Sequence, residues 1–139
     1  MIILDTDVMS ALMRPAPEKA VADWLDLQSP VAVWTTAITI MELRFGIQIL
    51  PEGKKRSRLL EEFDAVLVED IGERIVAFDV VAARHTANLM ADRQKRGRPL
   101  ELRDTMIAGI ALAHDATIAT RNTAHFRDLS VSVINPWVA

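Results

Sequence analysis

The sequence predicts a single domain of the α/β class, with a parallel central sheet of about five strands flanked by helices. Three observations support this prediction. Short apolar runs typical of buried strands alternate with longer segments whose apolar residues recur at helical spacing. Half of the 139 residues are hydrophobic and a quarter are charged, which is the balance of a globular domain. No repeat, linker or low-complexity segment divides the chain, so residues 1–139 are expected to share one core, with right-handed crossovers between strands.

The expected elements alternate along the chain. Strands are expected at residues 2–4, 31–35, 75–78, 117–120 and 131–134, where apolar runs end in polar turns. Helices are expected at residues 17–28, 38–50, 58–68, 80–96 and 101–114, where apolar side chains repeat every three to four positions. The stretch RFGIQIL at residues 44–50 also alternates, so a strand remains open there. Residues 54–56 are basic and are expected to form a solvated loop or a patch.

Composition and charge limit the kinds of function. The formal net charge is −3, so any contact with nucleic acid must come from a local basic patch. The chain has no cysteine, which excludes disulfides and thiolate metal sites and leaves oxygen ligands or three histidines. Oxygen ligands favour magnesium or manganese. The first residues read as a strand rather than a signal peptide, and no apolar run is long enough to span a membrane, so the expected compartment is the cytoplasm.

Glu42 is the most informative single residue. On a helix over residues 38–50, its carboxylate would interrupt an apolar stripe formed by Ile38, Phe45 and Ile49. A buried carboxylate requires a cation or strong hydrogen-bond donors nearby. The segment Thr39-Ile40-Met41-Glu42 also matches a helix capping box, in which Glu42 would only accept a hydrogen bond from a backbone amide. The pattern leaves both interpretations open.

Other acidic and amide side chains are expected at strand ends or at helix starts. Asp5 and Asp7 follow the first strand, Asp104 lies in the first turn of a helix, and Asn122 follows a later strand. Each alone has an ordinary explanation as a turn former or a residue that complements the helix dipole. Together with Glu42 they all fall where a parallel sheet binds its ligands, at the carboxyl ends of the strands. Such an oxygen-only group suits magnesium and the hydrolysis of a phosphodiester through activated water.

The histidines and the basic residues form no metal-binding pattern of their own. The histidines, His85, His114 and His125, are not spaced as a metal cluster and are expected to be structural or solvated. A basic run comes before Asp104 and is expected either to be a solvated helix end or to hold RNA phosphates; its members are Arg93, Lys95, Arg96, Arg98 and Arg103. Arg121 is the better candidate for a phosphate contact, because a guanidinium can bind two oxygens at once.

Four ordered motifs resemble the PIN-domain family, specifically the toxin nucleases of VapBC-type and FitAB-type toxin–antitoxin pairs. The motifs are ILDTDVMSALMR, TTAITIMELRFGIQIL, LRDTMIAGIALAHDATIATRN, and HF followed by VINPW. The resemblance covers essentially the whole chain. It implies a three-layer PIN-like fold, with residues 1–139 forming a single PIN domain.

The resemblance also implies roles for individual residues. Asp5, Glu42 and Asp104 match the family's acids and are the implied metal ligands. Asn122 stands where many members carry a fourth acid, which leaves a second metal position poorly supplied. Thr120 matches a hydroxyl residue that would orient a carboxylate or a water. The accessory positions are Thr6, Asp7, where relatives more often have Asn, and Arg121.

The implied activity is endoribonuclease cleavage of RNA with Mg²⁺ or Mn²⁺. The implied partner is a small antitoxin whose C-terminal segment wraps the toxin and blocks its site; operator DNA would be bound only through that antitoxin. Relatives generally form homodimers, and the apolar helices around residues 38–67 are candidate surfaces for dimer and antitoxin contacts.

Two alternatives belong to other classes. Asp5-Thr6-Asp7 after an apolar strand also resembles the start of haloacid-dehalogenase-type phosphatases, in which Asp5 would be the nucleophile. That chemistry needs a later lysine, and no lysine follows residue 96. The second alternative is a catalytically weak PIN-fold binding module that lost activity through Asn122. The three remaining carboxylates argue against it.

Overall fold

The centre of the fold is a parallel β-sheet. The computed structural model describes residues 1–99 and 101–139, and within them the sheet has five strands in the order β3-β2-β1-β4-β5. The strands are β1 (Ile2–Leu4), β2 (Val33–Thr36), β3 (Ile75–Val76), β4 (Thr117–Ala119) and β5 (Val133–Ile134). All neighbouring strands run parallel, and Ile3 of β1 is paired with Trp34 on one side and Ile118 on the other. The predicted parallel sheet of about five strands is confirmed.

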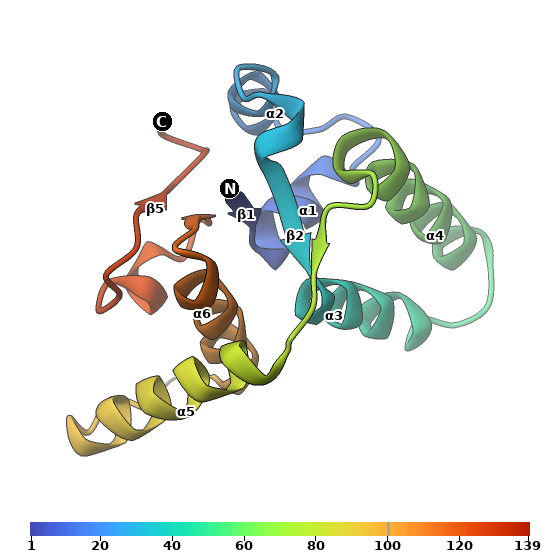
Figure 1. Ribbon diagram of the computed structural model, residues 1–139. Coiled ribbons are helices and arrows are strands. Elements are labelled where there is room, and N and C mark those ends of the chain that lie inside the picture. The colour runs from blue at the N-terminus through green and yellow to red at the C-terminus, as the bar shows by residue number, and fades with distance from the viewer. Residues whose placement is uncertain (100) are drawn as a thin grey trace.

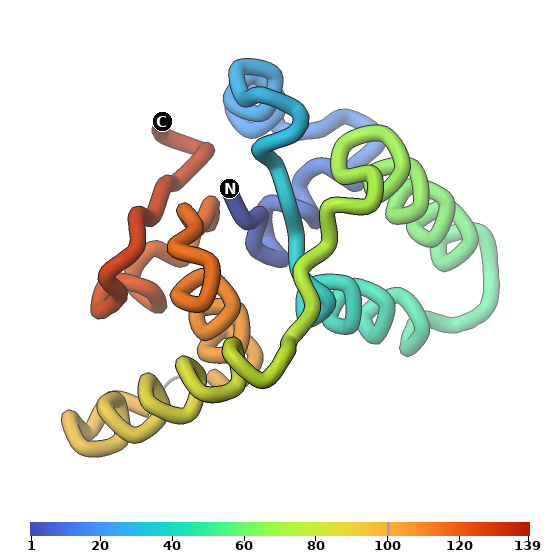
Figure 2. The backbone as a smooth tube through the Cα atoms, viewed as in Figure 1, coloured from blue at the N-terminus to red at the C-terminus, as the bar shows by residue number. Residues whose placement is uncertain are grey.

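Helices connect the strands and lie on both sides of the sheet (Figure 1). They are α1 (Thr6–Leu12), α2 (Lys19–Asp26), α3 (Ala37–Gln48), α4 (Lys54–Val66), α5 (Val80–Lys95) and α6 (Leu102–His114). Shorter helical turns cover Pro30–Ala32 (η1), Leu67–Ile71 (η2) and Thr123–Phe126 (η3). The continuous trace shows the chain reaching β1 and β2 first and coming back, after α5 and α6, to the other side of β1 (Figure 2).

Two hydrophobic layers explain why the sheet is covered on both faces. Side chains alternate along a strand, so neighbours in β1 point to opposite faces. Leu4 belongs to the cluster that contains buried residues of α1, α2 and α4, whereas Ile3 belongs to the cluster formed with α5 and α6. Ala119 and Ile118 of β4 divide in the same way. The result is the predicted three-layer arrangement, with strands that read as continuous apolar runs.

Several local predictions were wrong. Residues 6–12 form α1, where only a polar loop was expected after the first strand. The basic residues 54–56 are the first turn of α4, which begins four residues earlier than the predicted helix. Residues 44–48 are helical, so the open strand alternative for RFGIQIL is excluded. Phe45 and Ile49 are 59% and 66% exposed, so of the apolar stripe around Glu42 only Ile38 lies in the core.

None of the helices in the described ranges combines the length and the apolar character that crossing a membrane requires.

Candidate functional site

The site begins at Asp5, where β1 passes into α1. The Asp5 amide donates to the Ala119 carbonyl (2.9 Å), which ties the end of β1 to β4. The Asp5 carboxylate caps α1 by accepting from the Thr6 amide (2.8 Å) and also accepts from the Thr120 hydroxyl (2.8 Å). Asp5 is only 3% exposed. The switch of strand order on the two sides of β1 therefore places a buried carboxylate at the carboxyl edge of the sheet.

Asp7 lies beside Asp5, in the first turn of α1. One of its oxygens, Oδ2, accepts from the Arg121 amide (3.0 Å) and lies 3.5 Å from the Thr120 hydroxyl. Its other oxygen, Oδ1, is buried and has no hydrogen-bond partner within residues 1–99 and 101–139. A buried acceptor without a donor is uncommon in folded proteins, and it marks a position that a cation or water would satisfy.

Burial and crowding disfavour the charged forms of these two acids. Burial, followed by the charge of Asp7, raises the pKa of Asp5 to about 7. Burial also raises the pKa of Asp7 above its ordinary value. A nearby positive ion would reverse both effects, because it would stabilise the ionised carboxylates.

Glu42 reaches the same region from α3. Its Oε1 accepts from the Thr6 hydroxyl (2.9 Å), which lies 3.2 Å from the hydroxyl of the buried Thr39. Burial raises the pKa of Glu42, and Arg103 lies 3.9 Å from its Oε2. The capping-box interpretation is wrong, because the N-cap of α3 is Thr36, whose side chain accepts from the Thr39 amide (3.1 Å).

Asp104 comes from the first turn of α6, as the sequence predicted. The N-cap of this helix is Glu101, which accepts from the Asp104 amide (3.1 Å). The charge of Asp104 adds to burial in raising the pKa of both Asp5 and Glu42, so Asp104 lies within electrostatic reach of each of these two acids. The fold therefore brings together the acids of β1, α3 and α6 that lie far apart in the sequence.

Three predicted residues follow β4. The Thr120 hydroxyl is buried between Asp5 and Asp7 and accepts from the Asn122 amide (3.0 Å). Asn122 is exposed and contributes its backbone rather than its side chain to these contacts. Arg121 lies over the ring of Trp137, 4.2 Å from its centroid, and its backbone amide contacts Asp7.

His125 is a site residue that sequence reasoning missed. Its Nδ1 lies 2.7 Å from Asp104 Oδ2, although all three histidines were expected to be structural or solvated. Spacing carried no signal for this contact, because η3 must first bring His125 back beside α6. The HF pair after the Asn122 turn was the available clue.

Two arginines of the basic run before Asp104, Arg93 and Arg103, have different surroundings. Arg93 is 2% exposed and forms hydrogen bonds with Asp128, so it is a buried structural residue and not a solvated one. Arg103 instead lies beside Glu42 and Glu101.

The acids form a loose group rather than a closed cage. Among the described residues, no three Asp, Glu or His side chains are already gathered tightly enough to enclose a metal ion. The donor set nevertheless fits a hard divalent cation, since it offers carboxylates, hydroxyls and the unpartnered Oδ1 of Asp7. Asp5, Glu42 and Asp104 are the residues that could hold such an ion. With it in place, the arrangement could bind a phosphate and activate water.

Fold and site define a class: α/β proteins with an acidic site beyond the carboxyl ends of a parallel sheet, at its topological switch point. The family model described as "PIN domain" matches residues 2–131. The chain therefore belongs to the PIN-domain family. It is 37% identical to VapC ribonuclease Y4jK of Sinorhizobium fredii over 137 residues, covering 99% of this chain and 98% of the relative. It is also 37% identical to Toxin FitB of Neisseria gonorrhoeae, covering 99% of each. The crystal structure of FitAcB from Neisseria gonorrhoeae superposes with a TM-score of 0.88 at 37% identity and full coverage of both chains.

Proposed function

We propose that this protein is the toxin of a toxin–antitoxin pair and that it cleaves RNA as a metal-dependent endoribonuclease. The names of its relatives, a ribonuclease and a toxin matched over nearly their whole lengths, support this proposal. The PIN-domain match argues against the phosphatase alternative.

One observation carries the proposal: Asp5 is a buried carboxylate among other acids, at the point where this fold binds ligands. An enclosed group of like charges is unfavourable for folding, and active sites are where such groups are kept. Asp5 is 3% exposed, its pKa is raised to about 7 by burial and by Asp7, and the adjacent Oδ1 of Asp7 has no partner among the described residues. A divalent cation would stabilise the buried charge of Asp5, lower its pKa, and give Asp7 Oδ1 a partner.

In the proposed site, Asp5, Glu42 and Asp104 hold the ion, and hydroxyl groups fix the carboxylates. Thr120 orients Asp5, and Thr6 orients Glu42, each through a hydrogen bond. The ion, Mg²⁺ or Mn²⁺, would supply the activation of water and the neutralisation of charge on the phosphodiester. Asn122 brings no fourth carboxylate, which favours one bound ion before RNA arrives.

The proposal also covers the compartment of the protein and its partners. We place the protein in the cytoplasm, where its RNA substrate and an antitoxin protein would be found, with operator DNA bound only through the antitoxin. The exposed side chains of Met41 and Phe45 on α3 and of its C-cap residue Ile49 follow one another at i, i+4 and i+8. Such an apolar row calls for a covering surface, and we assign it to a homodimer or antitoxin contact.

Purified protein incubated with cellular RNA and Mg²⁺, Mn²⁺ or EDTA tests the activity. We expect discrete cleavage that requires the ion and disappears in Asp5→Asn and Asp104→Asn. Asp23→Asn is the matched control, because Asp23 is an exposed carboxylate on α2 whose one ion pair among the described residues is with Lys19. Titration of Mg²⁺ by calorimetry gives a second measurement, in which the two site variants should lose binding.

Two results would contradict the proposal. Cleavage that survives in both site variants would show that the activity comes from a contaminant. Absence of cleavage together with normal metal binding would favour the binding-module alternative. Asn122→Asp tests whether the side chain at this position faces the site: the added carboxylate should raise metal affinity if it does, and unchanged metal binding and cleavage would remove Asn122 from the site.

A further inference from the structure

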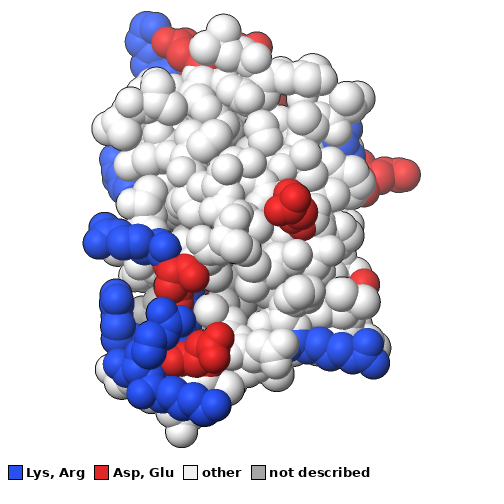
Figure 3. All heavy atoms as spheres, turned by 60° about the vertical axis from the view of Figure 1, so that its left-hand side comes forward, with Lys and Arg blue, Asp and Glu red and all other residues white. Residues whose placement is uncertain are grey.

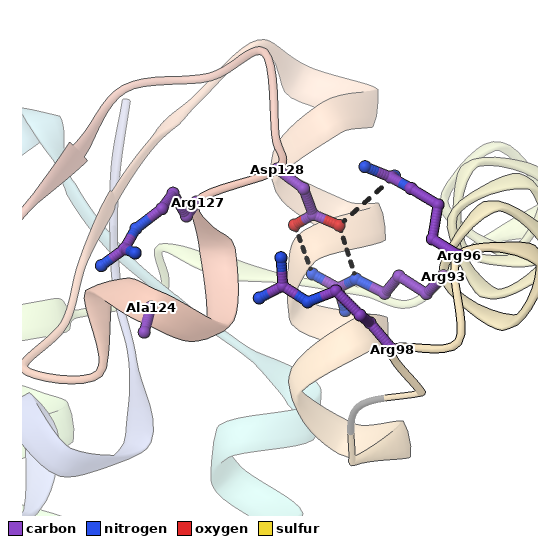
Figure 4. A pocket seen from close by; sticks show the side chains of 6 residues that line it. All are labelled: Arg93, Arg96, Arg98, Ala124, Arg127 and Asp128. Atoms are coloured by element: carbon purple, nitrogen blue, oxygen red, sulfur yellow. Dashed lines mark hydrogen bonds and ion pairs between the residues drawn. The ribbon is translucent and has the colours of Figure 1, made fainter.

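A second polar feature of the surface is a cavity of about 240 Å³ lined mainly by arginines (Figure 4). Its lining residues are Arg93, Arg96, Arg98, Ala124, Arg127 and Asp128. We call this cavity the arginine pocket. On the face drawn in Figure 3, Lys and Arg side chains gather mainly at the lower left, whereas most of the remaining face is uncharged. The protein as a whole carries a formal charge of −3, whereas the side chains that line this pocket carry a net positive charge.

The single aspartate does not neutralise the pocket. Asp128 accepts two hydrogen bonds from Arg93, each 2.9 Å long, and lies 3.7 Å from Arg96. Both carboxylate oxygens are thereby engaged. Arg98 and Arg127 form no ion pair with any residue in the described ranges, and in Figure 4 Arg127 points away from Asp128. Two guanidinium groups thus remain free to bind an anion.

The pocket and the acidic site share one structural wall, the short η3 segment. Ala124 of η3 lines the pocket, while the next residue, His125, contacts Asp104. Arg93 connects the two sides, since it donates to the His125 carbonyl (2.7 Å) and to the hydroxyl of Thr105 (3.0 Å), which directly follows Asp104. The free arginines therefore lie one segment away from the carboxylates.

We propose that the arginine pocket binds a phosphate of the RNA strand beside the phosphate that is cleaved. This inference rests on the proposed function and adds a substrate-binding subsite to it. A cluster of carboxylates repels a polyanion, so RNA must gain its binding energy close by from cations. Guanidinium groups suit this role because they bind phosphate oxygens in pairs. An acidic segment of a protein partner is the competing occupant. RNA is favoured because a strand cleaved at the acidic site has further phosphates on either side of the cleaved one, and these would extend past η3 to the pocket.

The test measures RNA binding without cleavage. A labelled, short, single-stranded RNA of mixed sequence is titrated with the protein in EDTA, at several salt concentrations, and followed by fluorescence anisotropy. The pocket variant is Arg98→Gln/Arg127→Gln. The control is Arg58→Gln/Arg84→Gln, which removes the same charge from exposed positions: Arg58 lies on α4, and Arg84 lies on α5 about 18 Å before Arg96.

We expect the pocket variant to bind RNA about tenfold more weakly than the parent. The slope of log K against log salt concentration should become shallower by about 0.7 for each phosphate contact that is lost. The control variant should match the parent in both affinity and slope. In cleavage assays with Mg²⁺, the pocket variant should raise KM and leave kcat nearly unchanged. Equal affinity and equal salt slope for pocket variant, control and parent would overturn the inference. So would a loss of antitoxin capture with RNA binding intact.

Failure of the nuclease proposal is a separate result. If the parent binds RNA through the pocket but shows no metal-dependent cleavage, the proposed activity is wrong and the phosphate site stands.

Discussion

At the scale of single residues, Thr120 controls the geometry of the buried acids through one hydroxyl. It donates to Asp5 and accepts from the Asn122 amide, so it fixes both the carboxylate and the turn after β4. We expect Thr120→Val, which keeps the shape, to lower RNA cleavage at least tenfold and stability by about 1 kcal/mol. Thr120→Ser keeps the hydroxyl and should retain most of the activity. Comparing kcat/KM and urea unfolding for the two variants checks this, and a Val variant as active as the parent would remove Thr120 from the site.

Asp128 carries a residue-scale prediction about pH. Its hydrogen bonds with the buried Arg93 hold the pKa of its carboxyl below the ordinary value of 3.8. A lowered pKa in the folded state adds stability that is present above the unfolded pKa and is lost as pH falls through the folded one. Asp128→Asn should therefore lose about 1 kcal/mol of unfolding free energy at neutral pH, because solvent screens this exposed carboxylate, with the gap to the parent closing below about pH 4. Urea unfolding at pH 7 and pH 3 measures this, and a gap independent of pH would contradict the ion-pair explanation.

At the scale of elements, the contact between α5 and α6 sets the position of Asp104, and Gly109 makes that contact close. A Cβ at Gly109 would lie 1.8 Å from the Thr86 hydroxyl and 2.8 Å from the Ala82 carbonyl of α5. We expect Gly109→Ala to push the helices apart and to lower stability by about 1–3 kcal/mol. The matched control is Gly46→Ala on α3, where nothing lies within 4 Å, and it should raise stability by about 0.5–1 kcal/mol. Denaturant midpoints of the two variants should move in opposite directions; similar shifts would refute this account of the helix contact.

The element that sequence reasoning missed, α1, shows why short helices at functional sites are hard to predict. Its start is polar because Thr6 and Asp7 serve the site, so the apolar residues that follow were too few to establish a helical period. Asp5 was interpreted as a strand end, whereas it is also the N-cap of α1. Asp5 thus follows the last residue of β1 and caps α1, so both elements fix the position of its carboxylate.

At the scale of the whole molecule, the parallel sheet could be predicted because it depends on periodicity. The proposed grouping of Asp5, Glu42 and Asp104 follows from the rule that parallel strands end at one edge of a sheet. The surroundings of the acids could not be predicted. The contact of His125 with Asp104 depends on the path of η3, and the burial of Arg93 depends on Asp128, 35 positions away. The Thr39–Glu42 pattern imitated a cap because β2 continues to Thr36, which a local pattern cannot locate.

The buried acids also set stability against function in the whole fold. Asp5 places a charge in the interior beside Asp7, and without a cation this charge works against folding. In EDTA near pH 8, Asp5→Asn should therefore be more stable than the parent, by about 1 kcal/mol, because the amide removes the repulsion. Millimolar Mg²⁺ should raise the melting temperature of the parent and not that of the variant, since an ion that binds only the folded state stabilises it by an amount that grows with the logarithm of the ion concentration once that concentration exceeds Kd. Thermal melts of both proteins with and without Mg²⁺ measure the two effects together. A variant less stable than the parent in EDTA would mean that the hydrogen bonds of Asp5 outweigh its burial, and that the acid is retained for the fold rather than for an ion.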